Sequence, residues 1–292
     1  MRRCEVVDRP TGFDLHDHVL WAHFGAEDWR KVLALFLQEG LVDNQRLVYA
    51  GTLQAEELLA DLVALPDLDG LLATRRLELW SAHADPEEIG RRDVAAQAAR
   101  LGSVVDAALA EGYTGIRLAS EITDALAHVD DAEAHLRLEC QVDQVAATHA
   151  LVVMCGFDRL VVDPATMQGE FAVHPLRGCG TEAPRLHALG DDTWSLGGQV
   201  DILSHAGFAQ AMAALPDVMR GDVLHLEVGQ LEFIDVAGLR ALVRLAEAVA
   251  DRGRVVLHQP PQWLARMLAL TFGTVEGLEL LEPERRRLRK LR

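Results

Sequence analysis

Lysine is nearly absent from this chain of 292 residues. Only Lys31 and Lys290 occur, so the other 26 of the 28 basic residues are arginine. A phosphate-binding loop of the G-x-x-x-x-G-K-[ST] type needs a lysine directly after a glycine, and neither lysine follows one. The sequence therefore excludes a nucleotide site built on such a loop.

Cysteine pairs, a secretion signal and long apolar runs are also missing. The four cysteines (Cys4, Cys140, Cys155 and Cys179) are widely spaced and form no C-x-x-C pair. They indicate reduced thiols in a cytoplasmic protein, and we expect neither a cysteine-based metal site nor a cofactor. The amino-terminal MRRCEVVDRPTG lacks an apolar signal segment, and no run approaches the length of a membrane span.

Positive charge is in deficit, with 28 basic against 45 acidic side chains and a net charge of −17. Phosphate backbones favour a basic surface, so this balance argues against a general nucleic-acid binder. The tail at 284–292, ERRRLRKLR, differs locally because it carries six basic side chains. A solvated helix end is the simpler interpretation, and a partner or nucleic-acid contact is the alternative.

Hydrophobic residues make up half of the chain, and its length favours two domains. Up to residue 176, strand-like runs at 15–23, 45–51, 77–82, 114–121 and 150–157 alternate with helical patterns at 26–44, 55–65, 90–111 and 130–148. Gly40 is expected to mark the end of the first helix. The alternation predicts a parallel, helix-flanked sheet, followed by a Gly- and Pro-containing linker at 177–184 and a smaller α/β domain at 185–283.

In the second half, an aspartate closes a strand-like run just before a helical pattern, in LEFIDVAGLRAL at 231–242. Asp235 suits a helix N-cap that accepts the N–H of Ala237 or Gly238. Together with LGGQVDILSHAGFAQAM and LHLEVGQLEFIDVAGLRALV, this turn makes residues 184 to about 283 resemble the STAS family. That module is shared by sulfate transporters and anti-sigma factor antagonists.

The STAS resemblance implies a protein-binding output, with an anti-sigma factor or a related signalling protein as the partner. In antagonists that switch partners, the serine after this aspartate accepts phosphate, which adds nearly two negative charges. Here that position is Val236. We therefore interpret Asp235, Val236 and Arg240 as a docking surface that is regulated from elsewhere. The alternative is a degenerate module kept for folding or for dimerisation as a homodimer.

Helical spacing predicts which side of this segment is exposed. Val236 and Arg240 are four residues apart and share a face. We expect the opposite side to pack on the sheet through Leu239, Leu242, Val243 and Ala246.

Residues 15 to about 176 resemble the MEDS family, the sensory domain named for methanogen and methylotroph regulators. The resemblance is carried by DHVLWAHF, FLQEGLVDNQRLVYAG, EGYTGIRLASEIT, HLRLECQVDQV, LVVMCGFDRLVV and VHPL. It implies an α/β fold related to the core of RecA-type ATPases but without a working phosphate loop. Asp124 stands where members often have Trp, and Cys140 interrupts a stretch that often carries Tyr-Glu. These departures bear on the ligand rather than on the fold.

A sensor of this kind is expected to bind its small ligand at the carboxyl ends of the parallel strands. Glu121 and Arg117 are predicted to lie near one strand end, where they orient a polar ligand or form an ordinary ion pair that caps the sheet. The other residues predicted at this edge are His23, Tyr49, Trp80, Asp158 and His174.

Three nearby histidines raise the question of a metal. His16 and His18 share one face of the expected strand, whereas His23 faces the other side. A three-histidine site would need a bend in the strand, so we predict no metal site. His18 is interpreted as a pocket residue or a hydrogen-bonding group of the core.

The sequence thus predicts a cytoplasmic, non-enzymatic regulator in which a MEDS-like domain senses a small molecule and a STAS domain binds a protein. Two alternatives remain open at this stage. One is an enzyme built on the first half, although no nucleophile and base stand out at a recognisable spacing. The other is a scaffold subunit of a larger signalling assembly.

Overall fold

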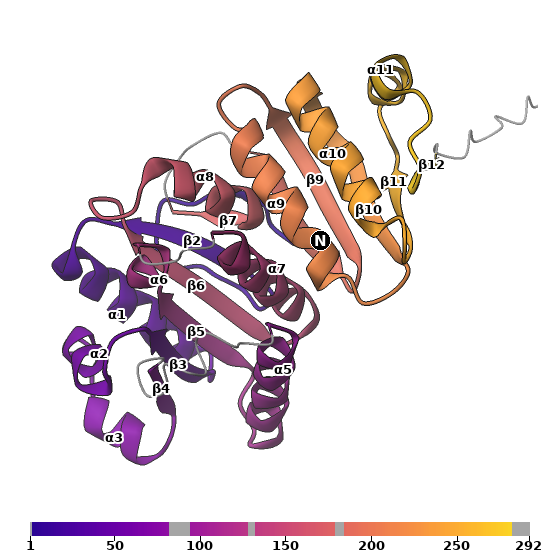
Figure 1. Ribbon diagram of the computed structural model, residues 1–292. Coiled ribbons are helices and arrows are strands. Elements are labelled where there is room, and N and C mark those ends of the chain that lie inside the picture. Colours follow the sequence, from indigo (N-terminus) through magenta and orange to yellow (C-terminus); the bar gives the residue numbers. More distant parts are fainter. Residues whose placement is uncertain (1, 82–93, 128–131, 179–183, 282–292) are drawn as a thin grey trace, which may run out of the picture.

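The computed structural model describes residues 2–81, 94–127, 132–178 and 184–281, which form two α/β domains (Figure 1). In the first domain, seven parallel strands lie in the order β1-β7-β2-β6-β5-β3-β4. These strands are β1 (Glu5–Val6), β2 (His18–His23), β3 (Arg46–Gly51), β4 (Leu77–Ser81), β5 (Ile116–Glu121), β6 (Leu151–Asp158) and β7 (Leu176–Arg177).

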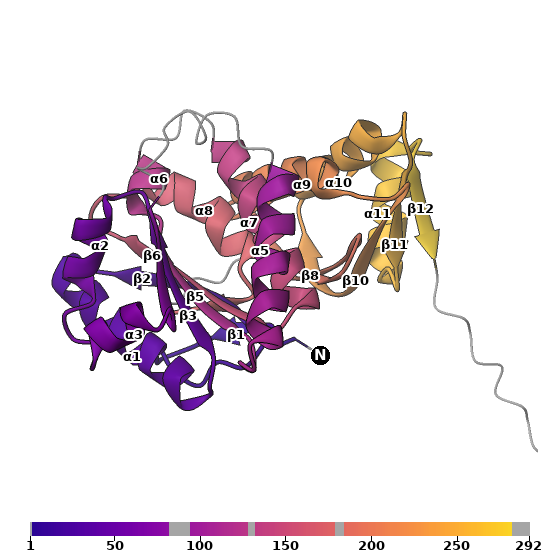
Figure 2. The same cartoon turned by 90° about the horizontal axis from the view of Figure 1, so that it is seen from below.

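Helices cover both faces of this sheet (Figure 2). One face carries α1 (Ala26–Val42), α2 (Ala55–Asp61) and α3 (Leu68–Ala73), and the other carries α5 (Val94–Ala110), α6 (Thr123–Ala127), α7 (Ala132–Thr148) and α8 (Pro164–Val173). Side chains alternate along a strand, so Val19 and Trp21 of β2 enter one core while Leu20 and Ala22 enter the other. The sheet is therefore buried on both sides, as its continuous apolar strands predict.

The second domain has a five-stranded sheet in the order β12-β11-β10-β9-β8, in which only the pair β8–β9 is antiparallel among the described strands. Its elements are β8 (Arg185–Gly190), β9 (Thr193–Val200), α9 (His205–Val218), β10 (Val223–Ile234), α10 (Val236–Val249), β11 (Arg254–His258), α11 (Gln262–Phe272) and β12 (Leu278–Leu281). The predicted fold class, a helix-flanked parallel sheet followed by a smaller α/β domain, is confirmed.

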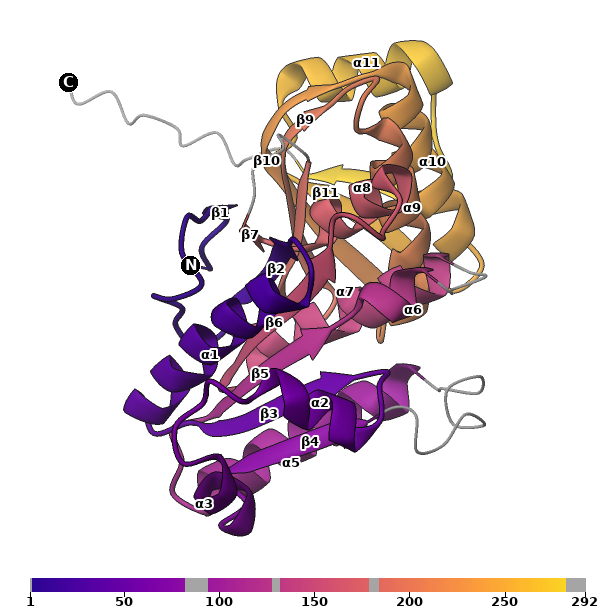
Figure 3. The same ribbon diagram turned by 90° about the vertical axis from the view of Figure 1, so that its left-hand side faces the viewer.

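The helix α7 lies between the two domains, with α8 beside it (Figures 1 and 3). One side of α7 faces β6, and the other side contacts α9 and β8. The hydrophobic core of the second domain includes Leu136 and Cys140 from α7 and Ala172 and Val173 from α8. The core of the second domain therefore extends onto α7 and α8 of the first domain.

One local prediction was wrong, and one helix was not predicted. Gly40 does not end the first helix, which continues to Val42; a Cβ at Gly40 would lie 2.7 Å from Leu47 and 2.8 Å from Arg117, so this glycine permits close packing. Residues 164–173, for which no element was predicted, form α8, which starts with Asp163 and Pro164, a typical helix-start pair.

The predicted domain boundary falls inside a strand, because Leu176 and Arg177 form β7 and pair with β1 and β2. Residues 179–183 of the predicted linker lie outside the described ranges, as do Cys179 and the basic tail at 284–292. Cys4, Cys140 and Cys155 are free thiols. None of the helices in the described ranges combines the length and the apolar character that crossing a membrane requires.

Candidate functional site

A hollow of about 440 Å³ opens at the carboxyl ends of β2, β5 and β6, beside α1 and α2. Three residues predicted for this edge, His23, Glu121 and Asp158, line it. The full lining consists of His23, Ala26, Trp29, Arg30, Leu53, Glu57, Ala60, Asp61, Glu121, Thr123, Asp124 and Asp158. The prediction of a pocket at this edge of the sheet therefore matches a concavity in the structure.

His23 is held between an indole ring and a carboxylate. Its ring stacks on Trp29 with centroids 5.2 Å apart, and its Nε2 lies 3.3 Å from Oε1 of Glu121. The hydroxyl of Thr123 donates to the same carboxylate oxygen and accepts the backbone N–H of Asp158 at 2.8 Å. The Nδ1 atom of His23 is buried and has no hydrogen-bond partner among the described residues.

Tyr49 lies behind the wall of the hollow rather than in it. Its hydroxyl accepts from Nε1 of Trp29 at 3.0 Å and donates to Asp61 at 2.9 Å. Burial raises the pKa of Tyr49, so the phenol stays neutral. Its two hydrogen bonds link Trp29 and Asp61, which both line the hollow. Trp80, at the end of β4, donates to Glu78 and is not part of the lining.

Negative charge dominates the lining of the hollow. Arg30 is the single arginine there, and its Nε bonds Asp61 at 3.1 Å. Five carboxylates also line the hollow: Glu57, Asp61, Glu121, Asp124 and Asp158. Such a lining repels phosphate and favours a ligand that is cationic or rich in hydrogen-bond donors.

The predicted pairing of Arg117 with Glu121 was wrong. The two residues stand near opposite ends of β5, and four residues of strand span about 13 Å. Arg117 is fully buried and pairs with Glu39 at 2.6 Å and with Asp43 at 3.2 Å. It also donates to Gln45 at 2.6 Å. Arg117 therefore ties β5 to α1 and does not reach the hollow.

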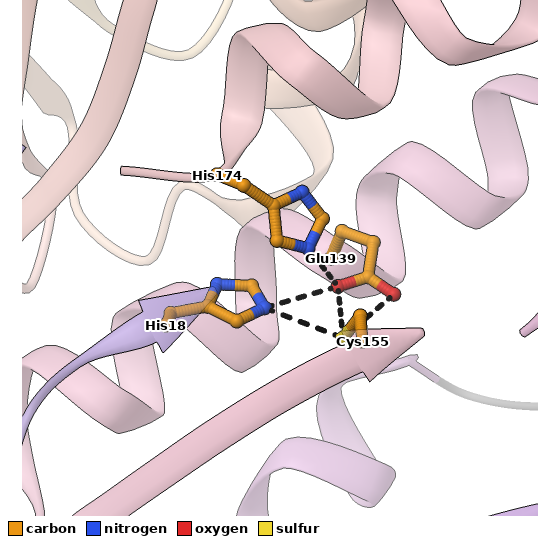
Figure 4. A group of neighbouring side chains, drawn as sticks. All are labelled: His18, Glu139, Cys155 and His174. Atoms are coloured by element: carbon orange, nitrogen blue, oxygen red, sulfur yellow. Dashed lines mark hydrogen bonds and ion pairs between the residues drawn. The ribbon is translucent and has the colours of Figure 1, made fainter. Parts of the chain in front are cut away.

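His18 and His174 lie in a second, fully buried group (Figure 4). His18 begins β2 and faces the side opposite to His23, whereas His174 directly follows α8 and is not at a strand end. Both rings contact Glu139 of α7, and His18 also contacts Cys155 of β6. We call these four residues the buried cluster. His16 lies apart, with its Nδ1 2.9 Å from the carbonyl of Ala146, so the three amino-terminal histidines do not converge.

Sequence reasoning did not single out Glu139 or Cys155. A signal was nevertheless present, because His135, Glu139 and Asp143 recur every four residues and so share one face of α7. Glu170 of α8 and His174, which directly follows that helix, have the same spacing. Polar residues at helical spacing between apolar neighbours indicate a buried polar face, which apolar periodicity alone does not reveal.

The turn at Asp235 has the predicted geometry. The Asp235 carboxylate caps α10 by accepting the N–H of Gly238 at 2.7 Å, which confirms the N-cap prediction. Val236 is 48 % exposed and Arg240 is exposed. The residues predicted to pack inward, Leu239, Leu242, Val243 and Ala246, are all buried.

More apolar side chains are exposed near this turn. Phe233, two residues before Asp235, is 48 % exposed, and Ile202 and Leu203, which follow the neighbouring strand β9, are 80 % and 75 % exposed. The backbone N–H of Asp235 bonds the carbonyl of Val200, so both strand ends reach the same edge. Solvent-exposed apolar groups gathered at one edge are typical of a protein-binding surface.

Comparison with protein families also divides the chain into two segments. The family described as MEDS, the MEthanogen/methylotroph, DcmR Sensory domain, matches residues 17–175, and the family described as Mlab, STAS domain, matches residues 187–272. The comparison with curated proteins gives no match. A sensory domain joined to a STAS domain indicates a signalling regulator. The first match spans more than half of the 292 residues, so the chain belongs to the MEDS family and carries a STAS domain after its sensory domain.

Proposed function

We propose that the protein is a cytoplasmic signalling regulator that binds a small ligand in the hollow of its MEDS domain and a partner protein at the Asp235 edge of its STAS domain. The partner class is an anti-sigma factor or a related signalling protein. The observation that supports this most is the shared core around α7, because it links the ligand-binding sheet physically to the output domain.

Binding rather than catalysis is proposed for the hollow. Its lining offers carboxylates, an imidazole, an indole and a threonine, but neither a serine nor a cysteine beside a base. The excess of carboxylates favours a small amine, or an uncharged molecule with several hydrogen-bond donors. The stacked pair of His23 and Trp29 provides an apolar wall for the carbon skeleton of such a ligand.

A continuous set of contacts leads from the hollow to the docking edge. Asp158 lines the hollow at the end of β6, and the chain continues from there into α8. The helix α8 packs on α9, whose first residue, His205, places Nδ1 3.4 Å from a carboxylate oxygen of Asp235. We propose that the ligand shifts α8 and α9 relative to Asp235, which requires different ligand affinities for the two positions.

Affinity capture of the intact protein from its own cells, followed by mass spectrometry of proteins and small molecules, tests both halves of the proposal. Arg240→Glu reverses a charge at the docking edge and, as a surface change, costs the fold within about 0.5 kcal/mol. We expect this variant to lose the partner protein and to keep the small molecule. Asp124→Asn, in the hollow, is expected to lose the small molecule.

Arg266→Glu is the matched control for the charge reversal, because Arg266 is also exposed but lies on α11, away from the Asp235 turn. It should capture the same partner as the unaltered protein. Undiminished capture by a folded Arg240→Glu protein would place the docking surface elsewhere. Unchanged small-molecule content in Asp124→Asn would remove the hollow as the sensing site.

A further inference from the structure

The buried cluster of His18, Glu139, Cys155 and His174 combines ligand types that bind transition metals. The four residues come from four separate elements or their ends, and their side chains converge on one point (Figure 4). All four are buried, and one potential donor atom from each lies within 4.8 Å of the others. Imidazole nitrogens, a carboxylate oxygen and a thiolate sulfur are the donors that proteins use for Zn²⁺.

The distances between donor atoms match a tetrahedral site. Glu139 Oε2 lies 3.3 Å from Nε2 of His18 and 3.3 Å from Nε2 of His174. Cys155 Sγ lies 3.5 Å from the same oxygen and 3.6 Å from Nε2 of His18. With metal bonds of about 2.0–2.1 Å for nitrogen and oxygen and about 2.3 Å for sulfur, the edges of a tetrahedron are about 3.3–3.6 Å. Four of its six edges therefore already have the right length.

The hydrogen bonds at Nδ1 of His18 and His174 leave the Nε2 lone pair of each ring directed toward the centre of the buried cluster. Nδ1 of His174 lies 2.8 Å from the backbone carbonyl of Glu170, which only accepts, so this nitrogen carries the proton. Nδ1 of His18 lies 3.2 Å from the carboxylate of Asp143 and donates to it in the same way. In the neutral rings, both Nε2 atoms then present lone pairs to the acceptor oxygen of Glu139.

Protonation of one histidine cannot give both Nε2 atoms a hydrogen bond to Glu139. The carboxylate oxygen of Glu139 lies between the Nε2 atoms of His18 and His174, so a proton on one of these nitrogens leaves the other facing the same oxygen. Nε2 of His174 would still face Glu139 without a donor, and it is a buried atom with no hydrogen-bond partner. A single cation between the four side chains would satisfy both imidazoles and the carboxylate together.

The charges of the four side chains also balance the charge of a divalent ion. The Cys155 thiol lies 3.5 Å from Oε2 of Glu139, to which it can donate its proton when no cation is bound. A bound metal ion would displace that proton to solvent and form a metal–thiolate bond. Two neutral imidazoles, one carboxylate and one thiolate then neutralise the ion, which lowers the cost of burying it.

The surroundings of the cluster support the same arrangement. Asp143 accepts a hydrogen bond from Nδ1 of His18 and another from the backbone N–H of Ala188 at 2.6 Å. Carboxylates that orient a ligating histidine in this way are typical of metal sites. The second oxygen of Glu139 lies 3.4 Å from Nε2 of His135, which in turn lies 3.5 Å from Glu170. His135 therefore contacts the second oxygen of Glu139 and links it to Glu170.

We propose that His18, Glu139, Cys155 and His174 bind one divalent transition-metal ion of the Zn²⁺ type in tetrahedral geometry. This departs from the sequence-based expectation of no metal site, because the ligands are distant in the sequence. It is independent of the proposed function and would stand if no small ligand or partner were found. Through Asp143 the site touches β8, so the metal would also stabilise the contact between the two domains.

Titration of the chelator-treated, full-length protein with Co²⁺ under reducing conditions tests the site. We expect one Co²⁺ per chain, with the intense visible bands of a tetrahedral site and a sulfur-to-cobalt charge-transfer band that Zn²⁺ abolishes. Cys155→Ser should lose the charge-transfer band, and His174→Gln should weaken Co²⁺ binding at least about 10-fold.

Cys140→Ser is the matched control, because Cys140 is also a buried thiol but packs in the core of the second domain. It should retain the complete spectrum, and circular dichroism establishes that each variant is folded. A spectrum of the unaltered protein without a thiolate band would overturn the proposal. So would an unchanged spectrum and affinity in both Cys155→Ser and His174→Gln.

Discussion

His187 of β8 shows how a single residue makes the stability of this protein depend on pH. The side chain is buried, and its Nδ1 has no hydrogen-bond partner. Burial lowers the pKa of His187 to about 4, against an opposing effect of Asp143, and the charges of Arg2 and Arg185 lower it further. The folded protein therefore holds this imidazole neutral at pH values where the unfolded chain, with a pKa of about 6.5, is already protonated.

The sign of the effect follows from proton uptake on unfolding. Because the unfolded state binds more protons, the stabilising contribution of neutral His187 is complete above pH 6.5 and is lost as the pH falls toward 4. We expect His187→Gln to reduce the loss of unfolding free energy between pH 7.5 and pH 5 by about 2 kcal/mol. Urea denaturation at the two pH values measures this. An equal loss in both proteins would show that His187 is protonated in the folded state.

At the scale of elements, the contact between α8 and α9 depends on a glycine. A Cβ at Gly207 would lie 2.4 Å from the backbone carbon of Gln168, so α9 can approach α8 this closely only without a side chain there. We expect Gly207→Ala to destabilise the protein by about 1–3 kcal/mol, although alanine favours a helix, because the backbone of α8 must move.

Gly102→Ala in α5 provides the matched control. There the new Cβ would meet only the side chain of His149, at 3.0 Å, and a side chain can move aside. Its helix propensity predicts no loss of stability and a gain of up to about 1 kcal/mol. Thermal denaturation compares the two variants. Equal stability of Gly207→Ala and the unaltered protein would mean that α8 and α9 do not pack as tightly as the structure shows.

At the scale of the whole molecule, the shared core predicts that the two domains unfold together. Leu136 and Cys140 of α7 belong to the same hydrophobic cluster as Trp194 and Phe208 of the STAS domain. Separating the domains would expose these side chains to water, at about 25 cal/mol for each Å² of apolar surface. We therefore expect one calorimetric transition with equal calorimetric and van't Hoff enthalpies. Two resolved transitions would show that the domains are thermodynamically independent.

Much of the secondary structure and domain organisation could be predicted from the sequence, because it depends on residues that are close to one another in the chain. Alternating strand and helix periodicity determined the parallel sheet and the smaller second domain. A single residue with a suitable side chain, Asp235, was enough to locate the start of α10, since a cap bonds only two or three residues ahead. The missing Gly-Lys pair excluded a phosphate-binding loop without any structure.

Tertiary structure alone decided what depends on contacts between distant segments. Glu121 and Arg117 were predicted to lie at the same strand end. Two residues four positions apart are neighbours on a helix, but on a strand they are about 13 Å apart. The buried cluster joins residues 18, 139, 155 and 174, and no local pattern relates these positions to one another. Their convergence follows from the strand order β7-β2-β6 and from the burial of α7 between two domains, which the packing of the complete chain determines.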